Sequence, residues 1–165
     1  MEVLRKIRFI SFLLIFSIFL QNQVYSLDRA VDESYVAPDF LLEDINGRKI
    51  SLDAYRDKKA VLIIFWTTWC PYCLRALSVL KQEKQDLDNA QVEVLAINME
   101  ESAFRVRKFV ERLGINFTVL LDRDGRVSEE YGIFGIPYYF LIAKNGKIVF
   151  RGSRFSKEKL RSLIY

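Results

Sequence analysis

Histidine is absent from this chain of 165 residues, and cysteine occurs only twice, as Cys70 and Cys73. A structural zinc site takes four ligands, drawn mainly from cysteine and histidine. Two cysteines without histidine cannot complete such a site within one chain, and only a site shared between molecules would suffice. The same absence argues against a protein that delivers copper or haem. We therefore predict no metal and no other cofactor.

Excess charge is also small. The chain has 25 basic and 21 acidic residues, a formal net charge of +4. Half of this excess lies in residues 1–26, where Arg5, Lys6 and Arg8 face only Glu2. The small remainder is dispersed over the rest of the chain, so nothing indicates a nucleic-acid partner. Hydrophobic residues make up 51% of the chain, and its length suits one domain.

Residues 1–26 have the pattern of an export signal. A basic start precedes the apolar stretch Phe9–Leu20, and Val24 and Ser26 stand three residues and one residue before the expected cleavage point. The stretch is short for a bilayer span of about 20 residues. We predict a signal peptide, with an uncleaved signal anchor tethered through residues 9–20 as the alternative. Both place the protein outside the cytoplasm, in the periplasm or its equivalent.

Hydrophobic patterns predict a tether at residues 27–37 and one α/β domain at residues 38–165. Two early strand–helix–strand units imply parallel pairing, and a late hairpin implies antiparallel strands in the same, mixed sheet. The expected elements are a hairpin around Asn46-Gly47, strand Ala60–Trp66, helix Pro71–Leu87, strand Val92–Asn98, a helix from the Ser102 cap to Leu113, strand Phe117–Asp122, a helical turn at 126–132, strands Tyr138–Ala143 and Lys147–Gly152, and a last helix capped by Ser156.

The cysteines stand where the first buried strand gives way to a helix. Helix N-termini carry unpaired N–H groups and a partial positive charge, which stabilise a thiolate at Cys70. Cys73, one turn further on, can attack a mixed disulfide formed on Cys70. A purely structural disulfide would close a loop too small for much entropic gain. Ordinary core cysteines would not explain the placement, so a reactive dithiol is the favoured interpretation.

The segment "FWTTWCPYC", residues 65–73, resembles the thioredoxin superfamily. The fuller pattern resembles its exported TlpA/ResA-like branch, through "APDFLLEDINGRKISL", "VEVLAINMEES", "FTVLLDRDG" and "YGIFGIPYYFLIAKNGKIV". The resemblance covers roughly residues 37–165. It implies a thioredoxin-like fold, a central mixed β-sheet flanked by helices with an added N-terminal hairpin, and a thiol–disulfide oxidoreductase activity.

The resemblance also assigns roles to particular residues. Cys70 would attack and Cys73 would resolve, as the redox-active disulfide. Pro137 would be the family's cis-proline, and Ile136 would offer backbone hydrogen bonds to an extended substrate peptide. The other expected substrate contacts are Trp69 and Tyr72, whereas Trp66 is expected in the core.

Two departures from the family pattern concern acids. Many relatives carry a glutamate where this chain has Ala76, and thioredoxins place a buried aspartate where it has Ile64. With no histidine either, the usual proton acceptor for the resolving thiol is missing. Glu100 and Glu101 follow a predicted strand nearby, but the capping pattern favours a solvated helix start for both.

We therefore predict an exported enzyme that reduces disulfides in exported proteins, with cytochrome c apoprotein as the substrate suggested by the resemblance and a membrane thiol carrier as electron source. A disulfide-donating oxidase or isomerase is the closest alternative. A peroxiredoxin-like peroxidase is another: Thr67 has the offset of the threonine that precedes a peroxidatic cysteine, although Trp69 and the CxxC replace the usual loop. The non-enzymatic alternative is a redox-sensitive binding module.

Overall fold

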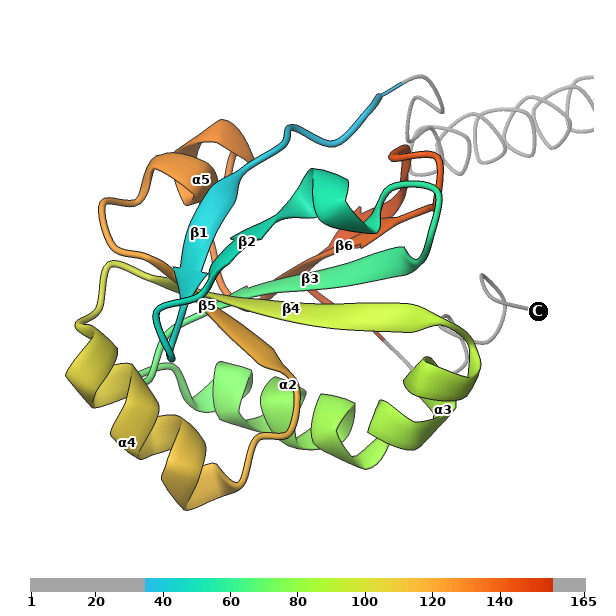
Figure 1. Cartoon of the computed structure of the whole chain (residues 1–165). Coiled ribbons are helices and arrows are strands. Elements are labelled where there is room, and N and C mark those ends of the chain that lie inside the picture. Colours follow the sequence, from blue (N-terminus) through green and yellow to red (C-terminus); the bar gives the residue numbers. More distant parts are fainter. Residues whose placement is uncertain (1–34, 156–165) are drawn as a thin grey trace, which may run out of the picture. The chain divides into compact units, whose positions relative to one another are not determined.

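The computed structural model describes residues 35–155, which form a seven-stranded mixed sheet with helices on both faces (Figure 1). The predicted signal segment and the last helix, with its Ser156 cap, lie outside the described residues. The elements are β1 Leu41–Asp44, β2 Lys49–Ser51, the 3-10 helix η1 Leu52–Tyr55, β3 Ala60–Trp66, α2 Pro71–Gln82, α3 Lys84–Asn89, β4 Val92–Met99, α4 Ala103–Leu113, β5 Thr118–Asp122, α5 Arg126–Glu130, β6 Tyr138–Ile142 and β7 Ile148–Gly152.

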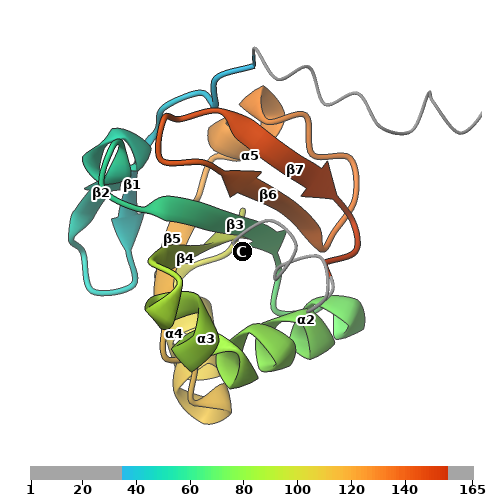
Figure 2. The same cartoon turned by 90° about the vertical axis from the view of Figure 1, so that its right-hand side faces the viewer.

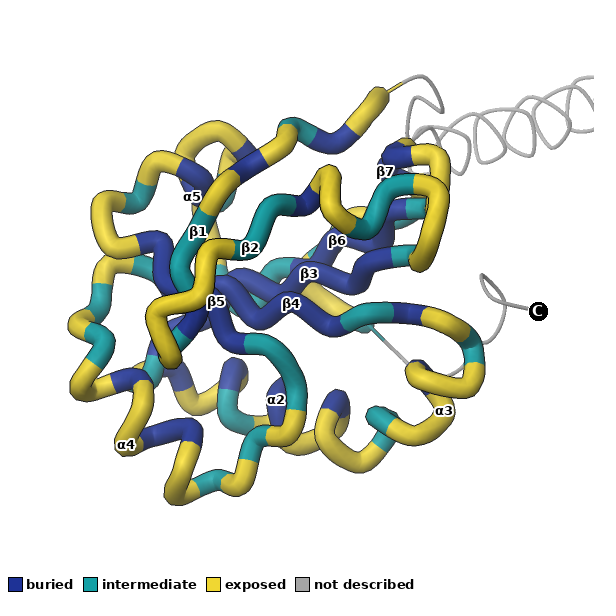
Figure 3. Tube along the Cα trace, viewed as in Figure 1, coloured by how far each residue is buried: buried dark blue, intermediate teal, exposed yellow. Residues whose placement is uncertain are grey.

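The strand order is β2-β1-β5-β4-β3-β6-β7. β3 pairs in parallel with β4 and antiparallel with β6, β4 pairs in parallel with β5, and β1 and β2 form an antiparallel hairpin. The mixed sheet and the N-terminal hairpin are as predicted. Helices α2, α3 and α4 cover one face and α5 lies on the other (Figures 1 and 2). β3 is therefore buried on both faces, which its continuous apolar sequence requires (Figure 3).

Side chains of β3 alternate between the two faces, as strand geometry dictates. Leu62, Ile64 and Trp66 belong to the core cluster that α2, α3 and α4 complete. Phe65 faces the other way, with its ring centre 5.5 Å from that of Tyr131. The Tyr131 hydroxyl donates a hydrogen bond of 2.6 Å to the Pro38 carbonyl, and burial raises the pKa of this phenol.

One predicted helix is divided. The expected helix Pro71–Leu87 is α2, which ends at Gln82, followed by α3, which continues to Asn89. Glu83 between them keeps nearly helical angles, φ −85° and ψ 0°, and donates its N–H to the Val79 carbonyl. Leu87 donates in turn to the Glu83 carbonyl, so the chain stays helical across the junction. Nothing in the local sequence explains the division.

The chain enters the sheet beside the β6–β7 hairpin. Tyr35–Ala37, at the end of the segment predicted as a tether, run along Gly146–Ile148. The Ala37 N–H donates to the Gly146 carbonyl at 2.9 Å, and the Ile148 N–H donates to the Tyr35 carbonyl at 3.0 Å. Val36 and Lys147 form an antiparallel bridge between these two bonds.

The Asn46-Gly47 hairpin is present, but its loop is held by a residue that the sequence did not reveal. Gly47 has φ +83°, in the left-handed region that glycine adopts readily, whereas Asn46 does not have a positive φ. The buried carboxylate of Asp44 accepts the N–H groups of Asn46 and Arg48 at 2.8 and 2.9 Å. It also accepts a hydrogen bond from Arg48 Nε at 2.7 Å.

Replacing Asp44 by asparagine should destabilise the fold in a pH-dependent way. Burial would raise the pKa of Asp44, but hydrogen bonds from Arg48 and Asn46 outweigh it and hold that pKa below its usual value. A depressed pKa contributes stability above the unfolded-state pKa of about 3.9, and this is lost as the pH falls through the folded-state value. Urea unfolding at neutral pH should show Asp44→Asn less stable by about 1–3 kcal/mol.

The difference in free energy of unfolding between Asp44→Asn and wild type should become smaller in acid. Asp53→Asn is the control, because Asp53 pairs with Arg56 at an exposed position, where an ion pair contributes about 0.5 kcal/mol or less. Equal losses of unfolding free energy in the two variants would contradict the stabilising role assigned to the Asp44 carboxylate. A loss in Asp44→Asn that stays constant in acid would contradict it too.

Candidate active site

The two cysteines lie at the junction of β3 and α2. Cys70 is the N-cap of α2, with extended backbone angles of φ −89° and ψ 110°, and Pro71 is the first helical residue. The Cys70 Sγ accepts the backbone N–H of Cys73 at 3.2 Å. The two residues form a disulfide, with Cα atoms 5.2 Å apart. A sulfur that accepts a helix N-terminal N–H is placed to be stabilised as a thiolate.

The disulfide is more enclosed than the sequence suggested. Cys70 is 4% exposed and Cys73 is completely buried, both within the core cluster beneath α2. Cys70 remains the more accessible sulfur, though by a narrow margin in this oxidised state. The assignment of Cys70 as nucleophile and Cys73 as resolving thiol is therefore still a prediction.

A second segment, distant in sequence, reaches the dithiol. The Ile136–Pro137 peptide bond is cis, as the resemblance implies. The Ile136 carbonyl oxygen lies 3.8 Å from Cys70 Sγ. β6 begins directly after Pro137 and runs antiparallel to β3, so their pairing places this bend beside the end of β3. The structure thus brings Ile136 to Cys70, and the predicted hydrogen bonds of its backbone to a substrate peptide stay a prediction.

The two tryptophans have different environments. Trp66 is fully buried, with its ring centre 5.4 Å from that of Phe109, so its prediction as a core residue is confirmed. Trp69 is 68% exposed and Tyr72 70% exposed. The Arg75 guanidinium lies 6.0 Å from the centre of the Tyr72 ring. Exposed aromatic rings on both sides of Cys70 suit contact with another protein.

An open groove of about 450 Å³ is lined by Trp69, which precedes Cys70 in the chain, and by Ile136, whose carbonyl faces Cys70, although neither cysteine lines it. Phe134, which the sequence analysis did not single out, lines it and is fully exposed. A lone aromatic residue between two glycines, just before Pro137, was the available signal. The groove is lined by Thr67, Trp69, Met99, Glu100, Glu101, Ile133, Phe134, Gly135 and Ile136.

Glu101 overturns one expectation. We predicted a solvated helix start for Glu100 and Glu101, and Glu100 is indeed exposed. The Glu101 side chain is only 6% exposed, and its carboxylate accepts hydrogen bonds from Thr68 and Asn98. The Ser102 cap beside it gave a correct local signal for the helix start. The turn after β3 packs against Glu101 from elsewhere in the chain, and no local pattern reports this.

The positions of the two missing acids are apolar in the fold as well as in the sequence. Ile64 is fully buried in the core cluster that contains Cys73, and Ala76 packs against the same cluster. Neither position offers a proton acceptor to the resolving thiol. The carboxylate that contacts the turn before Cys70 is that of Glu101, which lies between β4 and α4.

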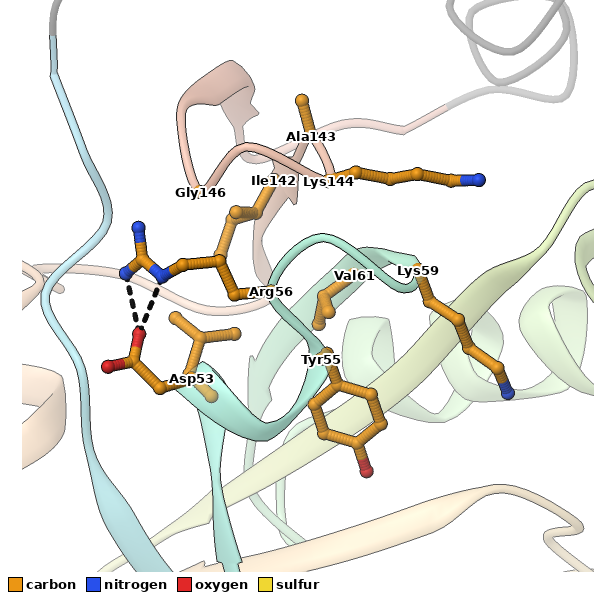
Figure 4. Close-up of a pocket in the computed structure, with 10 residues that line it drawn as sticks. Asp53, Tyr55, Arg56, Lys59, Val61, Ile142, Ala143, Lys144 and Gly146 are labelled. Atoms are coloured by element: carbon orange, nitrogen blue, oxygen red, sulfur yellow. Dashed lines mark hydrogen bonds and ion pairs between the residues drawn. The ribbon is translucent and has the colours of Figure 1, made fainter.

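A smaller hollow lies at the opposite end of β3 (Figure 4). It measures about 10 Å³, and the Arg56–Asp53 ion pair occupies one side of it. It contains no cysteine. Within residues 35–155, no cluster of three or more potential metal ligands occurs, and no helix is long and apolar enough to cross a membrane.

Comparisons with known proteins agree with this geometry. The model of the AhpC/TSA family matches residues 34–151. The thiol-disulfide oxidoreductase ResA of Geobacillus thermodenitrificans is 40% identical over 119 residues, which are 72% of this chain and 68% of the relative. ResA of Bacillus subtilis is 35% identical over 130 residues, 79% of this chain and 72% of the relative.

A solved structure from Chlorobium tepidum, described as a thiol:disulfide interchange protein DsbE, superposes with a TM-score of 0.71. It is 28% identical, and the match covers 81% of this chain and 94% of that one. The fold is thus a thioredoxin-like fold that carries a CxxC dithiol. The chain belongs to the AhpC/TSA family and, within it, to the ResA-like thiol–disulfide oxidoreductases.

Limited alkylation should distinguish the two thiols. In the reduced protein, substoichiometric iodoacetamide should modify Cys70 at least about tenfold faster than Cys73, because Cys70 caps the helix and is the less enclosed sulfur. Peptide mapping by mass spectrometry gives the ratio, and the oxidised protein is the unlabelled control. Preferential modification of Cys73 would contradict the assignment.

Proposed function

We propose that the reduced protein acts as a reductant of disulfides in exported proteins. The observation that carries this proposal is the placement of the Cys70 sulfur. It accepts an N–H group at the start of α2 and faces the Ile136 carbonyl beside an open groove. Cys70 is the attacking thiolate, Cys73 the resolving thiol, and the groove the docking site for the polypeptide that carries the target disulfide.

The exchange proceeds in two steps. The Cys70 thiolate attacks one sulfur of the target disulfide, a mixed disulfide forms, and the other target sulfur leaves as a thiolate and takes a proton from water. Cys73 then loses its proton to water and attacks the Cys70 sulfur, which releases the second target thiolate. Two electrons have passed to the target, and Cys70 and Cys73 are joined again.

The surroundings of the dithiol favour a protein over a small molecule as the target. Trp69, Tyr72 and Phe134 expose large apolar rings, but the disulfide itself is nearly buried. Ile136 and Pro137 would align an extended target chain, Ile136 through its backbone and Pro137 through the bend that it forms. Trp69 and Tyr72 would pack on the side chains that flank the target cysteine.

The cellular setting follows from the residues before the domain. The basic and apolar pattern of residues 1–26 supports export, with the domain held outside the cytoplasm either free or by a membrane anchor. A reductant in that setting needs electrons from the cytoplasm, which a membrane thiol carrier would supply. The resemblance to the TlpA/ResA-like branch points to cytochrome c apoprotein among the targets.

The reduction potential tests the direction of exchange. A strongly oxidising dithiol couple has a high reduction potential because its reduced form is strongly stabilised. Cys70 is nearly buried, and neither residue between the cysteines is charged, so the thiolate gains little beyond the helix N-terminus. Equilibration with dithiothreitol or glutathione should place the couple below about −230 mV, nearer to thioredoxin. A value above about −180 mV would indicate a disulfide donor or isomerase instead.

Trapping tests the substrate class and the resolving role together. Cys73→Ser should accumulate mixed disulfides through Cys70, because the chain contains no third cysteine that could resolve them. The trapped partners, identified by mass spectrometry from cells, should be exported proteins with cysteine pairs. Cys70→Ser is the matched control and should trap none. Cytoplasmic partners, or equal trapping by the two variants, would contradict the proposal.

A further inference from the structure

Glu101 is a buried carboxylate that contacts the turn before Cys70, and the exchange steps do not use it. Its side chain is 6% exposed, although it stands at the start of α4 and next to the exposed Glu100. Carboxylates are almost never buried to this extent unless hydrogen-bonded or paired. Its partners therefore indicate what the burial achieves.

Three hydrogen-bond donors converge on this carboxylate. Glu101 Oε2 accepts the Thr68 backbone N–H at 2.7 Å and Asn98 Nδ2 at 2.8 Å. Glu101 Oε1 accepts the Thr68 hydroxyl at 2.5 Å. Arg105, on the next turn of α4, approaches to 3.7 Å but is largely exposed. The main partner of Glu101 is thus a single residue, Thr68, held by both its backbone and its side chain.

Thr68 belongs to the short turn Thr67–Trp69, which connects β3 to the N-cap of α2. The pairing of β3 with β4 ends at Trp66 and Asn98, so sheet hydrogen bonds no longer fix the chain beyond Trp66. Glu101 supplies the missing attachment from the end of β4. Two residues of chain span at most about 7 Å, so fixing Thr68 also restricts where Cys70 can lie.

We propose that Glu101 is a positioning residue for thiol–disulfide exchange. It acts through Thr68 to hold the Thr67–Trp69 turn, and with it Trp69 and Cys70, in the orientation that faces the Ile136 carbonyl. This inference rests on the dithiol chemistry of the family and is independent of the direction of exchange and of the target protein. Its effect is on the rate at which Cys70 attacks.

The charge of Glu101 gives a second, separable effect. The N-terminus of α2 stabilises a Cys70 thiolate, and a nearby carboxylate opposes it. Glu100 also lines the groove, and Arg75 lies over Tyr72 on α2. Neutralising Glu101 should lower the pKa of Cys70, because a negative charge that opposes thiolate formation is removed.

Two substitutions separate position from charge. Glu101→Gln removes the charge and places an amide against the Thr68 donors. Thr68→Val removes one hydrogen bond and leaves the Glu101 charge in place. Thr68→Ser restores the hydroxyl and is the conservative rescue. Glu111→Gln, an exposed position near the end of α4, is the control for loss of one negative charge.

The readouts are the second-order rate constant for exchange with a small aromatic disulfide, the thiolate absorbance as a function of pH, and the free energy of unfolding. Rates are compared on the high-pH plateau, where Cys70 is fully ionised. There, a fall in thiol pKa slows attack only modestly, because the nucleophilicity of a thiolate depends on its pKa with a Brønsted coefficient of about 0.4–0.5. Glu101→Gln and Thr68→Val should each slow it about tenfold, and Thr68→Ser should exchange as wild type does.

Only Glu101→Gln should lower the pKa of Cys70. Plateau rates within twofold of wild type for both Glu101→Gln and Thr68→Val, with only the free energy of unfolding reduced, would overturn the proposal and leave Glu101 a purely structural residue. If Glu101→Gln does not fold, the Thr68→Val and Thr68→Ser pair decides alone. Slowing of Glu111→Gln to the same degree as Glu101→Gln would also overturn the proposal, whereas absence of exchange in wild type would instead contradict the assigned enzyme class.

Discussion

The contact between the Cys70 sulfur and the N–H of Cys73 ties the chemistry of this protein to its fold. That N–H group has no partner within the helix because it lies in the first turn of α2, which begins at Pro71, five residues after β3 ends at Trp66. The sheet fixes β3 from both sides, through β4 and β6. A change that displaced either neighbour would move the sulfur relative to the helix, and with it the energy of the thiolate.

The sequence was most informative where one residue pattern has one structural outcome. The run Ala60–Trp66 is apolar at every position, and only a strand covered on both faces suits it. Gly114 ends α4 in the left-handed conformation, as a helix-stop glycine should. The place of the CxxC motif in the fold could be predicted from the sequence, because Pro71 and the strand before Cys70 define the helix start.

What the sequence could not reveal are contacts between distant segments. Asp44 and Glu101 are acids in polar local contexts, and both are typical of exposed residues by composition. They are buried because Arg48 and Thr68, respectively, meet them with several donors at once. Phe134 is the reverse case, since a phenylalanine predicts burial and this one is fully exposed. Each exception except Asp44 lies at the groove beside Cys70.

The entry of the chain beside the β6–β7 hairpin has a consequence for how the enzyme meets other molecules. Tyr35 lies next to Ile148, near the residues that begin β3. Cys70 comes four residues after Trp66, the residue that ends β3. A strand of this length spans about 20 Å. The dithiol and Tyr35, where the described chain begins, therefore lie at opposite ends of the domain, and a large folded partner docked at the dithiol would leave Tyr35 uncovered.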